Sequence, residues 1–157
     1  RRPSQGLRVS HLELLVLSRS HETPPAPPPL AERIANALLA PGRVAVQWPN
    51  GPVAQLEQVD ERDREQIEQR WCRDGYRELR RPSGLEEWQW RSEFVSLRIT
   101  DRQLKKRLGR MLRKGKGRFG FHRALALHPD VQRAFRDYRR LQLIEFAERW
   151  LAEQAER

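Results

Sequence analysis

The residues best suited to chemistry in this sequence are cationic side chains, and they are concentrated in one stretch. Between Arg102 and Arg140 fourteen Lys and Arg residues stand against two acids, Asp130 and Asp137, which gives this stretch a net charge of +12. The whole chain of 157 residues carries +10, so the remainder is close to neutral. A concentrated basic surface is typical of proteins that bind a polyanion, most often nucleic acid.

Nine of these cations are candidate phosphate ligands. We expect them on the outer sides of two helices and in a glycine-rich loop, because the apolar sides of the same helices are needed for a core. The predicted nucleic-acid-binding residues are Arg102, Lys106, Arg110 and Arg113 on the first basic helix, Lys116 and Arg118 in the loop, and Arg133, Arg136 and Arg140 on the last helix. Contacts of this kind give affinity without much sequence specificity.

Two other interpretations of the basic stretch stay open. It could bind an acidic protein partner, or it could be an ordinary solvated surface, since arginine-rich helices are common in proteins from high-GC genomes. A bias in composition does not explain a bias in placement, however, because acidic residues balance basic ones in the rest of the chain.

Hydrophobic periodicity predicts both basic helices. A capping-box pattern from Thr100 to Gln103 begins the first, which we expect from Asp101 to Lys114. Its apolar stripe consists of Leu104, Leu108, Met111 and Leu112. The last helix begins at Pro129 and has two stripes on opposite sides. The first stripe consists of Val131, Ala134, Phe135, Tyr138 and Leu141, and the second of Ile144, Ala147 and Leu151.

One straight helix cannot serve a single core with two opposite stripes. We therefore expect a break or kink in the last helix, between residues 139 and 143. The alternative is a straight helix whose two ends contact different partners, such as a second subunit.

Gly115, Gly117 and Gly120 form a G-x-G-x-x-G pattern after the first basic helix. A dinucleotide site needs a strand before this pattern, and here a helix precedes it, so we exclude nucleotide binding. We expect instead an interhelical loop with positive φ at the glycines and with Phe119 and Phe121 packed into the core. The basic residues of this loop could still hold a backbone phosphate.

No arrangement of residues indicates catalysis, a metal or a cofactor. His122 and His128 have no further ligands at metal-binding spacing, and no catalytic triad order or poised carboxylate pair occurs. We therefore expect a protein that is not an enzyme. The single cysteine, Cys72, excludes an internal disulfide and indicates a reducing, cytoplasmic location. No apolar run approaches roughly 18 residues, so we expect no membrane-spanning helix.

The residues before the basic stretch predict a β-hairpin flanked by helices. We expect helices at 30–40 and 60–74, a half-buried strand at 44–48, a returning strand at 53–59 and a short strand at 76–80. A capping box of Ser83 and Glu86 opens a further helix. Trp88 and Trp90 cannot share one side of that helix, so we expect one of them to face solvent or a partner.

The expected fold is therefore α+β and predominantly helical, with a small N-terminal β-hairpin and a C-terminal helical bundle. We expect an N-terminal helix at 1–23, a stiff proline spacer at 24–29 and a main domain at 30–157, whose C-terminal helical half is 83–157.

The C-terminal half also carries an ordered series of features. In chain order these are a stretch from Tyr76 to Pro82, a helix ending in Phe94, the leucines Leu104, Leu108 and Leu112, the run from Gly115 to Phe121, then Pro129, the pair Phe135 and Tyr138, and the pair Trp150 and Leu151. This order resembles the bacterial uncharacterised protein family 158 of the UPF series, over residues 76–155. Members of that family often have Arg where Gly120 stands. The resemblance implies a helix-rich bacterial domain and assigns no activity.

The charge distribution thus predicts a non-enzymatic nucleic-acid-binding or ribonucleoprotein-associated module, without distinguishing RNA from DNA. The alternative is a protein–protein interaction adaptor, which would use the proline spacer, the exposed tryptophan and the second stripe of the last helix. The oligomeric state stays open.

Overall fold

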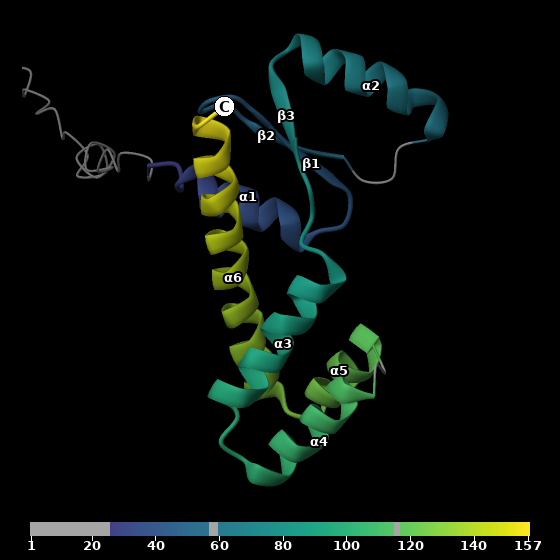
Figure 1. The fold of residues 1–157 in the computed structure, drawn as a ribbon, viewed down its shortest axis with the longest axis vertical. Coiled ribbons are helices and arrows are strands. Elements are labelled where there is room, and N and C mark those ends of the chain that lie inside the picture. The colour runs from purple at the N-terminus through teal and green to yellow at the C-terminus, as the bar shows by residue number, and fades with distance from the viewer. Residues whose placement is uncertain (1–25, 57–59, 115–116) are drawn as a thin grey trace, which may run out of the picture.

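The computed structural model describes residues 26–56, 60–114 and 117–157. Within them the elements are α1 (Leu30–Leu39), β1 (Arg43–Gln47), β2 (Val53–Leu56), α2 (Glu61–Arg73), β3 (Tyr76–Leu79), α3 (Gly84–Arg98), α4 (Arg102–Arg113), α5 (Gly117–Ala126) and α6 (Pro129–Ala155). The predicted class, α+β and mostly helical, is confirmed (Figure 1). The helix expected at 1–23 and the start of the proline spacer lie outside the described residues.

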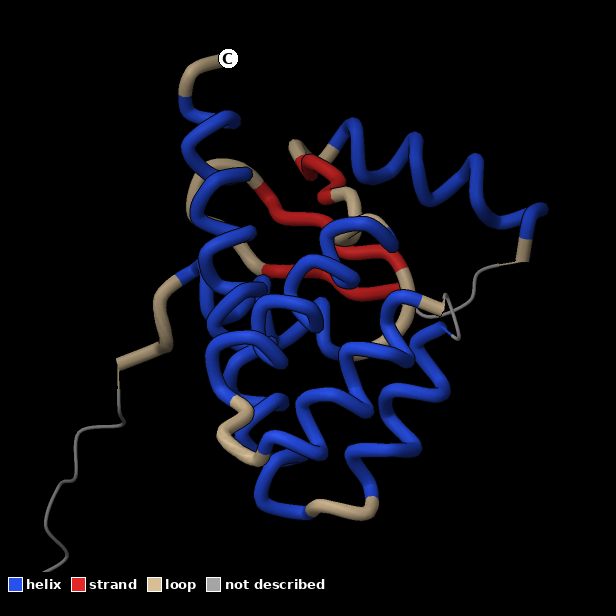
Figure 2. Tube along the Cα trace, turned by 60° about the horizontal axis from the view of Figure 1, so that its bottom comes forward, coloured by secondary structure: helices blue, strands red, loops and turns tan. Residues whose placement is uncertain are grey.

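The predicted hairpin is part of a three-stranded antiparallel sheet with the order β2-β1-β3 (Figure 2). β3 pairs with β1, where Val44 lies opposite Leu79. The central position of β1 corrects the expectation of a half-buried strand, because Val44, Ala45 and Val46 are all buried. Val44 and Val46 join the main core with α1, whereas Ala45 lies on the opposite side of the sheet.

Helix α2 is associated with that opposite side of the sheet. Its Trp71 stacks on Tyr76 of β3 with ring centroids 6.3 Å apart, and Arg43 of β1 lies over the Trp71 ring. The helix ends as predicted at Gly75, whose φ of +72° is readily adopted only by a residue without Cβ.

The C-terminus of α1 is capped by a long-range contact that the sequence did not indicate. The guanidinium of Arg81 donates hydrogen bonds to the backbone carbonyls of Leu38, Ala40 and Gly42. Carbonyls in the last turn of a helix have no partner within the helix, so Arg81, which follows β3, provides one.

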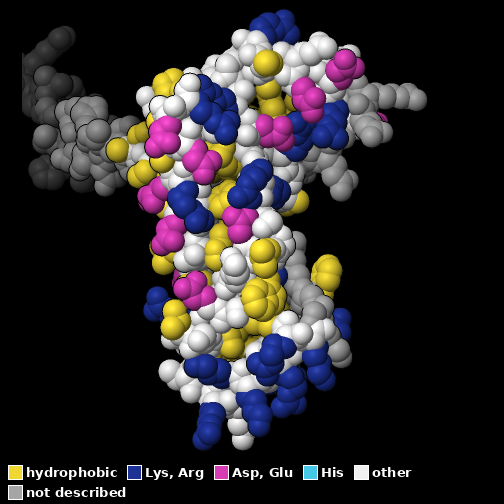
Figure 3. Space-filling view, in the orientation of Figure 1, with side chains coloured by type: hydrophobic (Ala, Val, Ile, Leu, Met, Phe, Trp, Pro, Cys, Tyr) yellow, Lys and Arg dark blue, Asp and Glu magenta, His cyan; other side chains and the backbone are white. Residues whose placement is uncertain are grey.

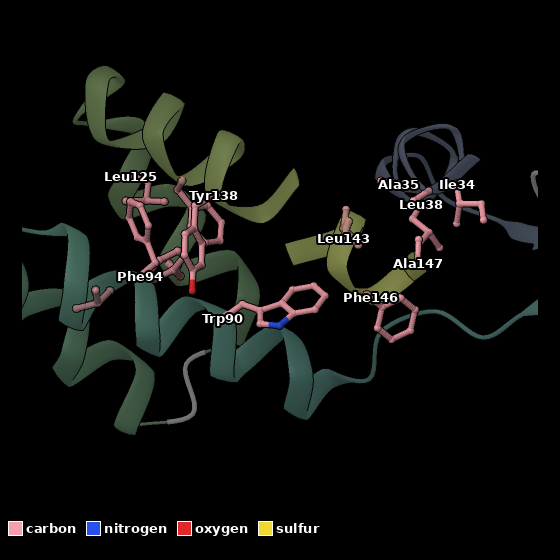
Figure 4. Packing of buried hydrophobic residues seen from close by; sticks show 14 of the residues in the cluster. Ile34, Ala35, Leu38, Trp90, Phe94, Leu125, Tyr138, Leu143, Phe146 and Ala147 are labelled. Atoms are coloured by element: carbon pink, nitrogen blue, oxygen red, sulfur yellow. The ribbon is translucent and has the colours of Figure 1, made fainter. Parts of the chain in front are cut away.

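Helix α6 is continuous from Pro129 to Ala155, so the predicted break is wrong. Its two stripes pack against different parts of the same chain (Figure 1). In Figure 4 one group of buried side chains consists of Phe94, Leu125 and Tyr138, the other of Ile34, Ala35, Leu38 and Ala147, and Trp90, Leu143 and Phe146 lie between them. The alternative of a helix whose two ends have different partners therefore describes α6 better, although both partners belong to this chain.

The group of buried side chains around Phe94 and Tyr138 consists largely of aromatic rings. Phe94 of α3 lies 5.1 Å from Phe135 and 5.5 Å from Tyr138 of α6 between ring centroids. Phe121 of α5 lies 5.1 Å from Phe135, edge to face. Such tilted and perpendicular arrangements are favourable for aromatic pairs. These ring contacts hold α3, α5 and α6 together, and α4 packs against α3 and α5.

The capping box predicted at the start of α3 is present and is extended by an ion pair. Ser83 Oγ accepts a hydrogen bond from the Glu86 amide, and Glu86 Oε2 accepts one from the Ser83 amide. Arg80 also donates to both oxygens of Glu86, at 2.8 and 3.1 Å. The hydrogen bonds from Arg80, with smaller contributions from Ser83, lower the pKa of Glu86 to about 2.

This pKa predicts a pH-dependent contribution to stability. The folded-state value lies below the unfolded value of about 4.3, so the stabilisation is present above that pH and is lost as the pH falls toward 2. Glu86→Gln keeps an acceptor for the capping box and should lower the free energy of unfolding by about 1 kcal/mol at pH 7. The effect is modest because the Arg80 side chain is 65% exposed.

Urea denaturation at several pH values measures this effect, with Glu148→Gln, an exposed carboxylate of α6, as the control. The difference between Glu86→Gln and the unmodified protein should shrink steadily below pH 5. A difference that stays constant down to pH 2 would contradict the assignment.

Candidate nucleic-acid interface

Helix α4 carries the densest cations of the described residues. Asp101 begins it, and its carboxylate accepts a hydrogen bond from the Leu104 amide at 2.7 Å, so Asp101 is the capping residue rather than the predicted Thr100. Leu104 and Leu108 are buried and Met111 and Leu112 half-buried, which confirms the predicted stripe. The helix contains no acidic residue. Its exposed cations are Arg102, Lys105, Lys106, Arg107, Arg110 and Arg113.

Four of these cations line a groove between α3 and α4, which we call the α3–α4 groove. It has a volume of about 710 Å³. From α3 it is lined by Trp88, Ser92, Val95 and Ser96, and from α4 by Arg102, Lys105, Lys106, Gly109, Leu112 and Arg113. Apolar side chains and a glycine thus share its surface with four positive charges. This combination suits an anion that also has a flat apolar part.

The α3–α4 groove has no carboxylate in its lining. By contrast, at least one Asp or Glu lines each of four other hollows on the described surface. None of the α4 cations forms an ion pair with a carboxylate of the described residues. In Figure 3 Lys and Arg side chains gather at the lower end of the molecule, over α4, while Asp and Glu lie higher up.

The placement of these cations opposes helix stability. Arg102 and Lys106 are like charges four residues apart, which destabilises a helix by a few tenths of a kcal/mol. Arg102 and Lys105 also lie in the first turn, where the helix dipole favours acids. A bound polyanion relieves both effects, whereas a purely structural helix would gain from acidic residues at these positions.

Two hydrogen bonds connect α3 and α4 across the groove. Lys105 Nζ donates to the Ser96 carbonyl at 2.6 Å, in the last turn of α3. Trp88 Nε1 donates to the Leu112 carbonyl at 3.3 Å, in the last turn of α4. Both ends of the groove are therefore held in place by contacts between the helices that form it.

Only part of the predicted set of nine cations lies together. Arg102, Lys106 and Arg113 line the α3–α4 groove. Arg110 is exposed on the same helix but does not line the groove. Lys116 lies outside the described residues. Arg118 belongs to the first turn of α5 rather than to a loop.

The three predicted residues of α6 are in a different setting. Arg140 is half-buried and forms an ion pair with Glu32 of α1 at 3.0 Å. Arg133 pairs with Asp130 at 2.5 Å on the exposed side of its own helix, and Arg136 is exposed. The neighbouring Arg139 pairs with Glu87 of α3 at 2.6 Å. Arg139 and Arg140 thus connect α6 to other helices, and α6 does not line the α3–α4 groove.

The glycine pattern is also placed differently from the prediction. Gly115 lies outside the described residues. Gly117 and Gly120 lie within α5, and Gly120 does not have the positive φ that we expected. Phe121 is buried as predicted, but Phe119 is 85% exposed. Helix α5 therefore starts earlier than expected and turns Phe119 toward solvent.

Sequence reasoning assigned to the site neither Lys105 and Gly109 of α4 nor the groove residues of α3. Lys105 and Gly109 lie four and three residues apart in a row that ends at Leu112 of the apolar stripe, and this helical spacing could have placed Lys105 in the site. Trp88 was one of the two candidates for an exposed tryptophan, and it is 40% exposed whereas Trp90 is buried.

The described residues contain no cluster of three or more His, Cys, Asp and Glu that could hold a metal. No helix in this part of the chain is long and apolar enough to cross a membrane. The chain matches no protein-family model, no curated protein and no solved structure. The resemblance to family 158 therefore stays a prediction.

Proposed function

We propose that this protein binds nucleic acid without catalysing a reaction, and that the α3–α4 groove is its binding site. The observation that carries this proposal is the lining of the groove, which has four cations and no carboxylate. Phosphate groups are the most common ligands of such surfaces, and several unpaired cations along one groove can follow a backbone of regularly spaced phosphates.

The comparison between α4 and α6 argues against a merely solvated basic face. Arginine-rich composition affects both helices, but three of the α6 arginines have carboxylate partners, as expected for an ordinary surface. The α4 cations have none among the described residues, although unpaired like charges weaken the helix. A binding role explains why the uncompensated charge is concentrated on one helix.

The dependence of affinity on salt tests the proposal. Binding of fluorescently labelled single-stranded and duplex oligonucleotides is measured by anisotropy at several salt concentrations. If the four groove cations each neutralise one phosphate, the log–log slope should be about −2.8 for a single strand or about −3.6 for a duplex. Poly-glutamate serves as a competitor that has charge but neither phosphates nor bases.

Affinity that does not change with salt would contradict the proposal, as would the absence of saturable binding to either oligonucleotide. Displacement of the oligonucleotide by poly-glutamate at equal charge concentration would favour an acidic protein partner instead.

A further inference from the structure

Trp88 is more exposed than the other tryptophans of the described residues, which are buried or half-buried. It is 40% exposed and lines the α3–α4 groove among four cations. Its Nε1 donates a hydrogen bond to the Leu112 carbonyl, so the ring of this α3 residue is held in place by α4. A ring fixed in this way loses little conformational freedom when a ligand packs against it.

The surface beside Trp88 is shaped for a flat group rather than for phosphates alone. Val95 and Leu112 contribute apolar surface, and Gly109 contributes no side chain. A Cβ placed on Gly109 would lie 3.5 Å from Arg113 Nη1, so the guanidinium extends over the space that the glycine leaves open. Apolar surface next to cations favours a ligand that alternates aromatic rings with anions.

We infer that the α3–α4 groove takes single-stranded nucleic acid and that a base stacks on Trp88 while neighbouring phosphates contact Arg102, Lys106 and Arg113. This inference rests on the function proposed above. In a duplex the bases are paired and stacked, so their faces cannot reach an aromatic side chain. In a single strand they can, and stacking on an aromatic residue tolerates any base.

Two substitutions test the inference without changing the charge of the protein. Trp88→Ala should weaken binding to a single-stranded oligonucleotide by about tenfold, leave its salt slope unchanged and leave duplex binding unchanged. Trp88→Phe should recover part of the loss because it restores a ring. Both variants are compared with the unmodified protein by anisotropy and by thermal unfolding.

Gly109→Leu provides an independent test that keeps Trp88 and every cation. Leucine is a better helix former than glycine, and the atom nearest to its Cβ is the end of a flexible arginine side chain, so the fold should be retained. The added side chain occupies the space beside Trp88 and should weaken single-strand binding by about tenfold, again with an unchanged salt slope.

The outcomes separate this inference from the proposed function. If Trp88→Ala and Gly109→Leu bind a single strand like the unmodified protein, while loss of groove cations weakens binding, stacking is refuted and the proposed function stands. Equal or tighter binding of a duplex of the same length also refutes the single-strand inference. If the unmodified protein binds neither oligonucleotide, the proposed function fails.

Discussion

Replacing Lys106 and Arg113 together by glutamate should weaken nucleic-acid binding by on the order of 100-fold, or about 2.7 kcal/mol. Both residues line the α3–α4 groove, so the double variant removes two of its four cations and adds two negative charges. The salt slope for a single strand should fall in magnitude by about 1.4, because two phosphate contacts are lost.

The chain offers a matched control for this experiment. Arg123→Glu with Arg136→Glu changes the net charge by the same amount, and both residues are exposed outside the groove. The two pairs are also matched in position. Arg113 and Arg123 lie in the last turn of a helix, where a new acid is unfavourable to the helix dipole, and the other member of each pair lies inside a helix. If binding responds only to net charge, the two double variants will be equally weak, and the groove will not be the site.

Truncating Phe94 should have the largest effect on stability, with Phe94→Ala lowering the free energy of unfolding by about 3–5 kcal/mol. The side chain is 1% exposed and its ring contacts those of Phe135 and Tyr138, so its loss leaves a cavity where α3 meets α6. Urea denaturation monitored by circular dichroism measures the change.

Phe119→Ala is the matched control, because the same truncation at an 85% exposed position creates no cavity. It should change stability by no more than about 0.5 kcal/mol. A comparable loss in the two variants would show that the aromatic cluster is not the centre of the core.

The helices could be predicted from the sequence because their signals are local. The capping box at Ser83, the stripe of α4 and the glycine after α2 each depend on residues a few positions apart. The burial of Ala45 could not be predicted in the same way, since it depends on how β3 and α2 return to the central strand from later in the chain.

The candidate site could be predicted only in part, for the same physical reason. The sequence located the excess charge, and three of the nine predicted residues line the groove. It could not distinguish paired from unpaired cations, because the partner of Arg140 is Glu32, which is 108 residues away. The role of Trp88 in the groove depends on how α3 and α4 pack, and no local pattern encodes that packing.

The continuous α6 has a consequence for how the chain can be divided. Its first half completes the aromatic cluster with α3 and α5, and its second half covers α1. A fragment limited to residues 83–157 would expose the stripe around Leu143 and Ala147 to water and would be prone to self-association. The helices α3 to α5 and the part of the fold that contains α1 and the sheet are therefore one cooperative folding unit. Because α6 packs against both, unfolding of either part destabilises the other.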